Sequence, residues 1–285
     1  MGTSWSLKAY AAPEVAGEAL RAAIEANFAH CIALFSTWEP SSFIRAFNRA
    51  PAGARLAAEK DFLFVLREAL RMADITDGAF DPGLLAEVNR RGFGPGGDLQ
   101  SGPPRAWAAI ALDETGVTQP GGVALDLSAI AKGFAVDCMA AAAAEAGCAA
   151  LLAEIGGEFV GAGVKPDGAP FWVAIEDTMG AASPFRVAMC GLALASSGDL
   201  WRRAGADGAT HIVRAESARN LHGDLACVSV IADSCMNADA WATALYAAGD
   251  EQGERLADAH GIAALFQYRD APPRWSRALI PMLED

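Results

Sequence analysis

Lys132 is one of only four lysines in the 285-residue chain, and it lies in the segment DLSAIAKGFA (126–135) at the start of an expected alanine-rich helix. Ser128 is a suitable N-cap residue, and Asp126 precedes it. The free N–H groups and partial positive charge of a helix start can bind phosphate, and a lysine one turn into the helix can reach the same anion. Two interpretations stay open: a phosphate site, or a solvated lysine on an outer helix face. The alanine-rich surroundings weigh against the second, because lysine is seldom buried without a partner.

Asp239 and Thr243 form a second candidate pair in NADAWATALYAAG (237–249). They are four residues apart, so a helix places both oxygen-bearing side chains on one face. A carboxylate and a hydroxyl are hard oxygen ligands, and together they make part of a Mg²⁺ site that phosphate or water completes. The alternative is structural. Asp239 would complement the helix dipole in a first turn that Asn237 caps, and Thr243 would pack against its neighbours.

The segment TDGAFDP (76–82) combines two aspartates with a glycine and a proline. Asp77 and Asp81 could accept hydrogen bonds from a ribose or a nucleobase. Gly78 also permits a tight turn, and Asp81 could cap a short helix with Pro82 at its first position. The residues alone do not separate the ligand site from the turn with its cap.

Two further patterns give weaker signals. His211 lies in an expected strand, GATHIVRA, and no Ser-His-Asp order or zinc spacing surrounds it, so a structural role competes with a catalytic one. Gly92, Gly94 and Gly97 match G-x-G-x-x-G. No expected strand precedes these glycines and no expected helix follows them, so the match does not predict a phosphate-binding loop.

The candidate residues depend on helices and strands that the apolar spacing predicts. Helices are expected over 15–35, 57–75 and 128–147, in short stretches within 36–51 and from Pro82 onward, and twice within 237–261. Strands are expected over 3–10, 122–128, 149–163, 170–177, 185–198, 211–215, 225–233 and 262–270. Helices dominate the first half and strands the second. This order favours a mixed α/β domain (α+β) over a regular βαβ array.

Composition excludes several classes of protein. The net charge is −13 and no basic stripe is present, which argues against nucleic acid and anionic membrane as partners. No segment has the roughly 18 uninterrupted apolar residues of a transmembrane helix. Six cysteines without C-x-x-C spacing are expected to be buried free thiols, which suits a reducing compartment. With no secretory signal at the N-terminus, the chain as given is expected in the cytoplasm; a periplasmic, membrane-anchored location would require a leader that has been removed.

Seven segments together resemble the ApbE family of FAD:protein FMN transferases, formerly called thiamine biosynthesis lipoproteins, nearly from end to end and in the family's order. MGTSWSL is similar to the family's opening strand, and LFSTWEPSSFIRAFNR to its next segment. The others are TDGAFDP, LDLSAIAKGFAVD, EIGGEF, LASSGD and NADAWATAL. TDGAFDP and D-L-x-x-I-A-K-G are the specific motifs. The resemblance implies one ApbE-like domain over 1–285, related to the T-fold, with mixed sheets and flanking helices.

The resemblance also implies a site. Mg²⁺ would be bound by Asp239, Thr243 and the backbone carbonyl of Ala129. His211, with Ile212 beside it, would lie near the flavin diphosphate. The FAD site would be lined by Met1, Trp38, Ala79, Phe80, Asp81, Asp126 and Lys132. Lys132 would therefore face the diphosphate or its close surroundings.

The implied reaction transfers FMN from FAD to a Ser or Thr hydroxyl of an acceptor protein, with release of AMP. Asp239 would act through Mg²⁺, and His211 is the candidate base. One alternative is Mg²⁺-dependent hydrolysis of FAD to FMN and AMP. Another is a non-catalytic FAD-binding protein, because Arg214 in HIVRAESARN stands where the family often has an acid.

Overall fold

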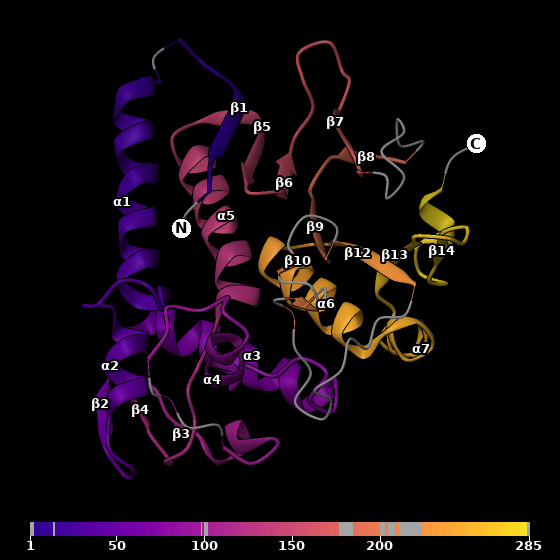
Figure 1. Cartoon of the computed structure of the whole chain (residues 1–285). Coiled ribbons are helices and arrows are strands. Elements are labelled where there is room, and N and C mark those ends of the chain that lie inside the picture. The colour runs from indigo at the N-terminus through magenta and orange to yellow at the C-terminus, as the bar shows by residue number, and fades with distance from the viewer. Residues whose placement is uncertain are drawn as a thin grey trace.

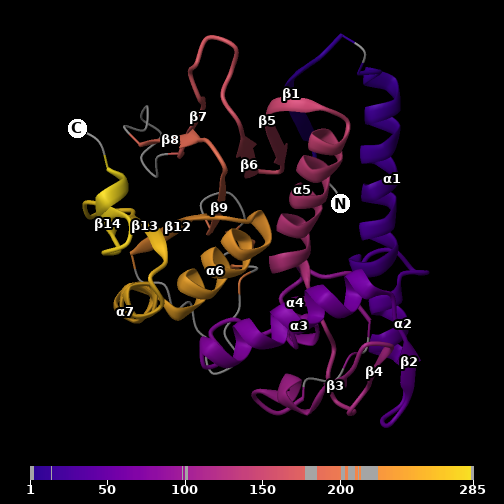
Figure 2. The same ribbon diagram turned by 180° about the vertical axis from the view of Figure 1, so that it is seen from behind.

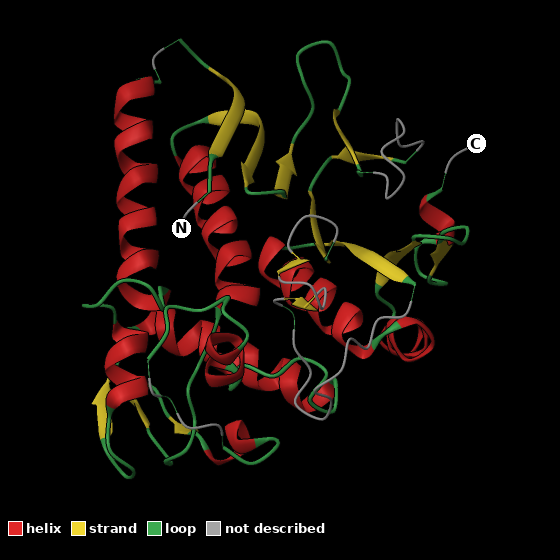
Figure 3. Ribbon diagram, viewed as in Figure 1, coloured by secondary structure: helices red, strands yellow, loops and turns green. Residues whose placement is uncertain are grey.

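The computed structural model describes residues 3–13, 15–97, 99, 102–176, 185–199, 203–204, 209–210, 212 and 224–283. Its α-helices are α1 (Gly17–Phe35), α2 (Phe43–Arg49), α3 (Lys60–Ile75), α4 (Leu85–Arg90), α5 (Ser128–Glu145), α6 (Cys235–Ala248) and α7 (Asp250–His260). Short 3₁₀ helices span Ala106–Ala109 and Ile280–Met282. The strands are β1 (Trp5–Ala11), β2 (Arg55–Ala57), β3 (Ala111–Leu112), β4 (Gly116–Thr118), β5 (Cys148–Ile155), β6 (Glu158–Ala162), β7 (Phe171–Ala174), β8 (Arg186–Met189), β9 (Leu192–Gly198), β10 (Arg203–Ala204), β11 (Ala209–Thr210), β12 (Leu225–Ala232), β13 (Ala263–Tyr268) and β14 (Arg274–Trp275). Figure 3 shows how helices and strands are distributed.

In the described part of the chain, seven strands form the largest sheet, in the order β1-β5-β6-β9-β12-β13-β14. Each neighbouring pair is antiparallel. Side chains alternate between the two faces of a strand, so each strand contributes to two different cores. In β5, Leu151 and Ala153 belong to the main core, whereas Ala150 and Leu152 belong to a second, smaller one.

Helices α5 and α6 cover one face of the sheet. Helix α5 packs on β5 and β6, α6 packs on β9 and β12, and the two helices contact each other along the seam. Helix α1 lies beside α5, as both views show (Figures 1 and 2), and α3 packs against α5 and α6. The main core lies in this layer and includes side chains as far apart in sequence as Ile24 and Tyr268.

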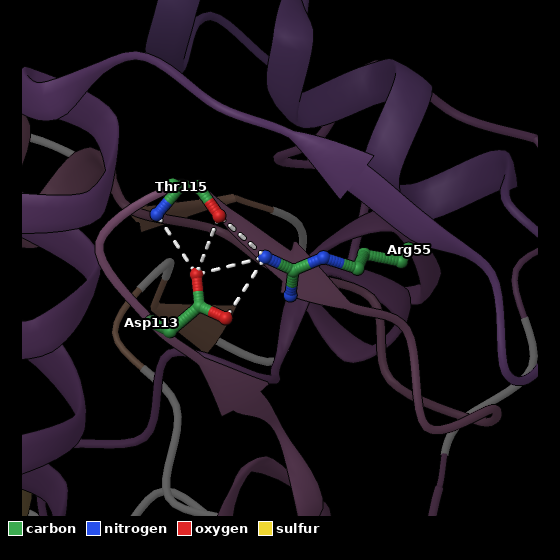
Figure 4. Close-up of polar contacts among 3 residues, drawn as sticks. All are labelled: Arg55, Asp113 and Thr115. Carbon is green, nitrogen blue, oxygen red and sulfur yellow. Dashed lines mark hydrogen bonds and ion pairs between the residues drawn. The ribbon is translucent and has the colours of Figure 1, made fainter.

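The opposite face is covered by the hairpin β7–β8. Phe171, Val173 and Val187 of this hairpin pack with Leu194 of β9 and Leu265 of β13 in the second core. A separate three-stranded sheet, β2-β4-β3, lies beside α2. Polar contacts among Arg55, Asp113 and Thr115 stabilise the β3–β4 connection (Figure 4). Asp113 accepts hydrogen bonds from the Arg55 guanidinium at 2.8 and 2.9 Å and from the Thr115 N–H at 2.8 Å.

The predicted long helices are confirmed as α1, α3, α5, α6 and α7, and most predicted strands occur in the expected segments. The strand expected over 211–215 lies outside the described residues, apart from Ile212. The strand expected over 122–128 is wrong. The Asn48 side chain takes both backbone groups of Leu125, its amide donating to the carbonyl at 2.8 Å and its oxygen accepting from the N–H at 2.7 Å. The segment makes only an isolated bridge, Leu84 to Ala124. That bridge is parallel and lies outside the named strands, whereas each strand pair of the described sheets is antiparallel. The single-domain organisation stays a prediction.

Candidate active site

A cavity of about 880 Å³ lies where the end of α1, the start of α5 and the middle of α6 meet the β5–β6 hairpin and strands β9 and β12. Its volume is in the range of small-molecule and cofactor sites. Its lining includes these residues predicted from sequence: Trp38, Ala79, Phe80, Asp81, Asp126, Ala129, Lys132, Ile212, Asp239 and Thr243. The fold thus brings together residues spread over some 200 positions. Met1, His211 and Arg214 lie outside the described residues.

The turn after α3 holds Ala79, Phe80 and Asp81 against the cavity. The Thr76 hydroxyl donates to the Met72 carbonyl at 2.6 Å and accepts from the Phe80 N–H at 3.1 Å, which fixes the turn to the helix end. Asp81 accepts from the Gly83 N–H at 2.7 Å, so its carboxylate stabilises a turn. The expected helix cap at Asp81 is wrong, as is Pro82 at a first helical position, because α4 begins only at Leu85. Burial raises the pKa of Asp81 to about 6, against the opposing effects of the Gly83 N–H and Arg105.

The start of α5 is organised by Asp126. Its carboxylate accepts from the Ser128 N–H at 2.9 Å, and its own N–H donates to the Pro82 carbonyl at 2.8 Å. Ser128 is therefore the first helical residue and not the N-cap, which is Leu127. Burial raises the pKa of Asp126. A carboxylate thus already occupies the first N–H of this helix, and among the described residues that line the cavity the cationic side chain is that of Lys132.

Lys132 is not a solvated surface lysine. Its side chain is 32% exposed, and its ammonium forms an ion pair with the carboxylate of Glu158, which is 3% exposed. Burial works to lower the pKa of Lys132, but the charges of Asp239 and Glu158 outweigh it and hold the pKa above its ordinary value. Both carboxylates thus favour the charged form of Lys132, which lines the cavity beside them.

Glu158 has no role in the sequence-based prediction, although it lies within the EIGGEF segment. It begins β6 directly after the β5–β6 turn, and it lines the cavity. Its Oε2 is buried and has no hydrogen-bond partner within the described residues. Burial raises the pKa of Glu158, and Lys132 opposes this shift. The one feature of the sequence that marks Glu158 is its position, as an acidic residue directly after Gly156 and Gly157 between two apolar strands.

Asp239 joins α6 to α5. Its carboxylate is almost fully buried and accepts from the Gly133 N–H at 2.9 Å. Gly133 allows the helices to meet, because a Cβ there would lie 2.3 Å from the carbonyl oxygen of Cys235. Burial raises the pKa of Asp239, while Lys132 and the Gly133 N–H oppose that shift. The structural alternative for Asp239, a helix-dipole partner in the first turn, does not fit, because α6 begins at Cys235 and Asp239 is its fifth residue.

Thr243 lies one turn further along α6 and lines the same cavity. Its hydroxyl shares a hydrogen bond of 2.9 Å with the hydroxyl of Ser197 on β9, a second residue that the sequence-based prediction omitted. The expected N-cap, Asn237, is wrong: Ser234 caps α6 and accepts from the Asn237 N–H at 3.3 Å. Asn237 is instead inside the first turn.

The donors predicted for Mg²⁺ suit a hard cation. The Asp239 carboxylate, the Thr243 hydroxyl and the Ala129 carbonyl belong to residues that line one cavity. In an α-helix the N–H of Gly133 pairs with the carbonyl of Ala129, and Asp239 competes for that same N–H. The described residues contain no group of three or more His, Cys, Asp or Glu side chains arranged for a metal. A metal here would therefore use mixed oxygen donors together with phosphate or water, which suits Mg²⁺ and not a soft metal.

Trp38 marks the outer rim of the cavity, with 64% of its surface exposed. It lies in the loop after α1, where the Ser36 hydroxyl accepts from the N–H groups of Trp38 and Glu39 at 3.3 and 3.2 Å. Phe80 and Ile212 are buried cavity residues. The cavity therefore combines a charged region at α5 and α6 with aromatic and apolar walls.

The profile of the ApbE family matches residues 1–266. A Vibrio cholerae protein named FAD:protein FMN transferase is 31% identical, over 93% of this chain and 84% of its own length. The chain belongs to the ApbE family. A Haemophilus influenzae protein with the same name is 30% identical, over 84% of this ApbE chain and 75% of its own.

Solved ApbE structures share this fold. The apo form of the Pseudomonas stutzeri flavinyl transferase ApbE has a TM-score of 0.88 and 29% identity, and the match covers 100% of this chain and 95% of that one. The flavin transferase ApbE from Vibrio cholerae has a TM-score of 0.88 and 28% identity, with 99% and 96% covered. The ApbE-like fold class predicted from sequence is confirmed, and this ApbE-family chain is an enzyme of the transferase class. Within the described ranges, no helix is long and apolar enough to cross a membrane.

Proposed function

We propose that this chain is a Mg²⁺-dependent FAD:protein FMN transferase, which moves FMN from FAD to a serine or threonine hydroxyl of an acceptor protein and releases AMP. One observation supports this most directly: a single cavity is lined by the Lys132 cation and by the hard-oxygen residues Asp239, Thr243 and Ala129. A diphosphate needs cations on its oxygens, and this region supplies one directly and can bind another. The relatives that share the fold are named for the same transfer.

The flavin and adenosine ends of FAD need aromatic and hydrogen-bonding contacts, whereas its diphosphate needs cations. In the proposal, the rings of Trp38 and Phe80 contact the flavin or the adenine. Asp81 and Asp126 accept hydrogen bonds from ribose or ring N–H groups. Both carboxylates line the cavity and both hold backbone N–H groups of their own turns, so each is positioned before a ligand arrives. The cavity volume of about 880 Å³ suits a ligand with two ring systems.

The chemistry requires a stabilised diphosphate and an activated hydroxyl. Mg²⁺, when bound, supplies Lewis-acid stabilisation of the phosphate oxygens. Lys132 places a positive charge beside the same oxygens, and Asp239 and Thr243 would hold the ion in position. The acceptor hydroxyl oxygen forms a bond to the phosphorus of the FMN half, the bond from that phosphorus to the bridging oxygen breaks, and AMP leaves with the bridging oxygen. The hydroxyl proton passes to a base, for which His211 is the candidate.

The proposal is tested by incubating the protein with FAD, Mg²⁺ and peptides that contain serine or threonine in varied sequence contexts. A peptide whose mass increases by that of FMN under denaturing conditions, together with an equal amount of AMP, supports a transferase. Free FMN and AMP at the same rate with and without peptide would make it an FAD hydrolase. FAD that binds and stays intact would make it a non-catalytic flavin-binding protein. Cell fractionation tests the cytoplasmic location, which stays a prediction.

A further inference from the structure

Asp137, on α5, holds the start of α6. Its two carboxylate oxygens accept from the N–H of Cys235 at 2.8 Å and from the N–H of Met236 at 2.9 Å. Ser234 accepts from the next N–H, that of Asn237. A helix start leaves its first N–H groups without intrahelical partners, and here the first two are satisfied by another helix. The start of α6 therefore depends on a side chain nearly 100 residues earlier in the chain.

A second link runs in the opposite direction. Asp239 of α6 accepts from the Gly133 N–H of α5 at 2.9 Å. Gly133 and Asp137 are four residues apart on α5, and Cys235 and Asp239 are four apart on α6, so each pair lies on one helix face. Each helix thus presents a carboxylate to the backbone of the other. With no room for a Cβ at Gly133, these bonds determine how α6 lies along α5.

The proposed metal donors are divided between these helices: Ala129 belongs to α5, and Asp239 and Thr243 belong to α6. Mg²⁺ requires near-ideal octahedral geometry with oxygen distances of about 2.0–2.1 Å. A small slide of one helix along the other would separate the donors by more than that geometry tolerates. We propose that Asp137 is a positioning residue for Mg²⁺, which places the α6 donors opposite the α5 carbonyl. This inference rests on the proposed function.

The test compares Asp137→Asn with Asp113→Asn. Asparagine at 137 keeps one acceptor oxygen but presents an NH₂ group to the second backbone N–H. The control removes a carboxylate that also accepts from backbone and side-chain donors, in the β3–β4 connection (Figure 4). Asp113 and its partners Arg55 and Thr115 do not line the cavity. FAD cleavage is measured against Mg²⁺ concentration, and Mn²⁺ binding to the FAD-bound protein is measured by electron paramagnetic resonance. Outer partners of metal ligands change metal affinity by about 10- to 100-fold.

For Asp137→Asn we expect the half-saturating Mg²⁺ concentration and the Mn²⁺ dissociation constant to rise about 10-fold or more, with kcat at saturating Mg²⁺ within roughly two-fold of the parent. Asp113→Asn should match the parent in all three. Parent-like metal dependence in Asp137→Asn, whatever its melting temperature, overturns the inference and leaves the proposed function intact. A parent protein without Mg²⁺ dependence overturns both.

If Asp137→Asn does not fold, Asp137→Glu replaces it, because it keeps both oxygens and moves them by one methylene. We expect the same weakening of metal binding from this displacement. A folded Asp137→Glu protein with parent-like Mg²⁺ and Mn²⁺ binding overturns the inference.

Discussion

Asp239→Asn separates the two roles of the buried carboxylate. Asparagine keeps an oxygen that can accept from the Gly133 N–H, but it removes the negative charge beside Lys132. A hydrogen bond to a charged acceptor contributes about 1.5–3 kcal/mol and one to a neutral acceptor about half as much. Part of that loss is offset, because a buried carboxylate also costs desolvation free energy. We therefore expect a loss near 1 kcal/mol, which lowers the melting temperature of a chain of this length by about 2 °C.

The expected effect on FAD cleavage is much larger. An amide oxygen is a weaker Mg²⁺ ligand than a carboxylate, and among the described residues no group of three or more His, Cys, Asp or Glu side chains is arranged to bind the ion elsewhere. We expect turnover at ordinary Mg²⁺ concentrations to fall by at least about 100-fold, or roughly 2.7 kcal/mol in activation free energy. Chromatography of FAD, FMN and AMP measures the rate, and calorimetry measures unfolding.

Asp239→Ala completes the comparison. It also removes the carboxylate acceptor of the Gly133 N–H, which keeps only the Ala129 carbonyl, and the loss of one hydrogen bond adds about 1 kcal/mol of destabilisation. The two variants should thus lose activity alike and differ in melting temperature. Substantial turnover in Asp239→Asn would refute the metal assignment. Equal melting temperatures for the two variants would refute the role of the Gly133 hydrogen bond.

Three further predictions follow from the cavity. Lys132→Met should weaken FAD binding by about 10- to 100-fold and destabilise the fold, because it leaves Glu158 buried without its cation. Adding Glu158→Gln should restore the stability of the fold but not the affinity for FAD. If the double variant recovers both stability and affinity, Lys132 is purely structural. Asp81→Asn should gain stability relative to the parent as the pH rises from 4 to 7. The folded-state pKa of Asp81, about 6, lies above the ordinary value of 3.8, so ionisation of Asp81 destabilises the folded parent across that pH range, by about 2 kcal/mol at pH 7 after allowance for partial exposure. Urea unfolding at pH 4 and pH 7 measures the stability difference between variant and parent, and the same difference at both pH values contradicts the prediction. FAD should bind more tightly than FMN in calorimetry, because the matched residues line a cavity large enough for both halves; equal affinities would show that the adenosine half is not bound.

Local patterns predicted the helices well, and tertiary contacts moved their ends. Asn237 and Ser234 are both good N-cap residues, three positions apart, and local sequence does not decide between them. The structure uses Ser234 because Asp137 satisfies the two N–H groups that follow it. The failed strand at 122–128 has the same kind of cause. Its apolar alternation is real, but the Asn48 side chain takes the backbone groups of Leu125 that a neighbouring strand would have used.

The sequence by itself determined the family, the fold class and ten of the residues that line the cavity, because those depend on residue type and on order along the chain. It could not determine which charges meet. Lys132, Glu158 and Asp239 come from α5, β6 and α6, and their separation depends on the order of strands in the sheet and on how two helices lie across it. Sequence-based reasoning therefore identified Lys132 and Asp239 separately and omitted Glu158. Only the tertiary structure placed that buried carboxylate against the lysine, because charges are paired by distance in the folded chain and not by distance along it.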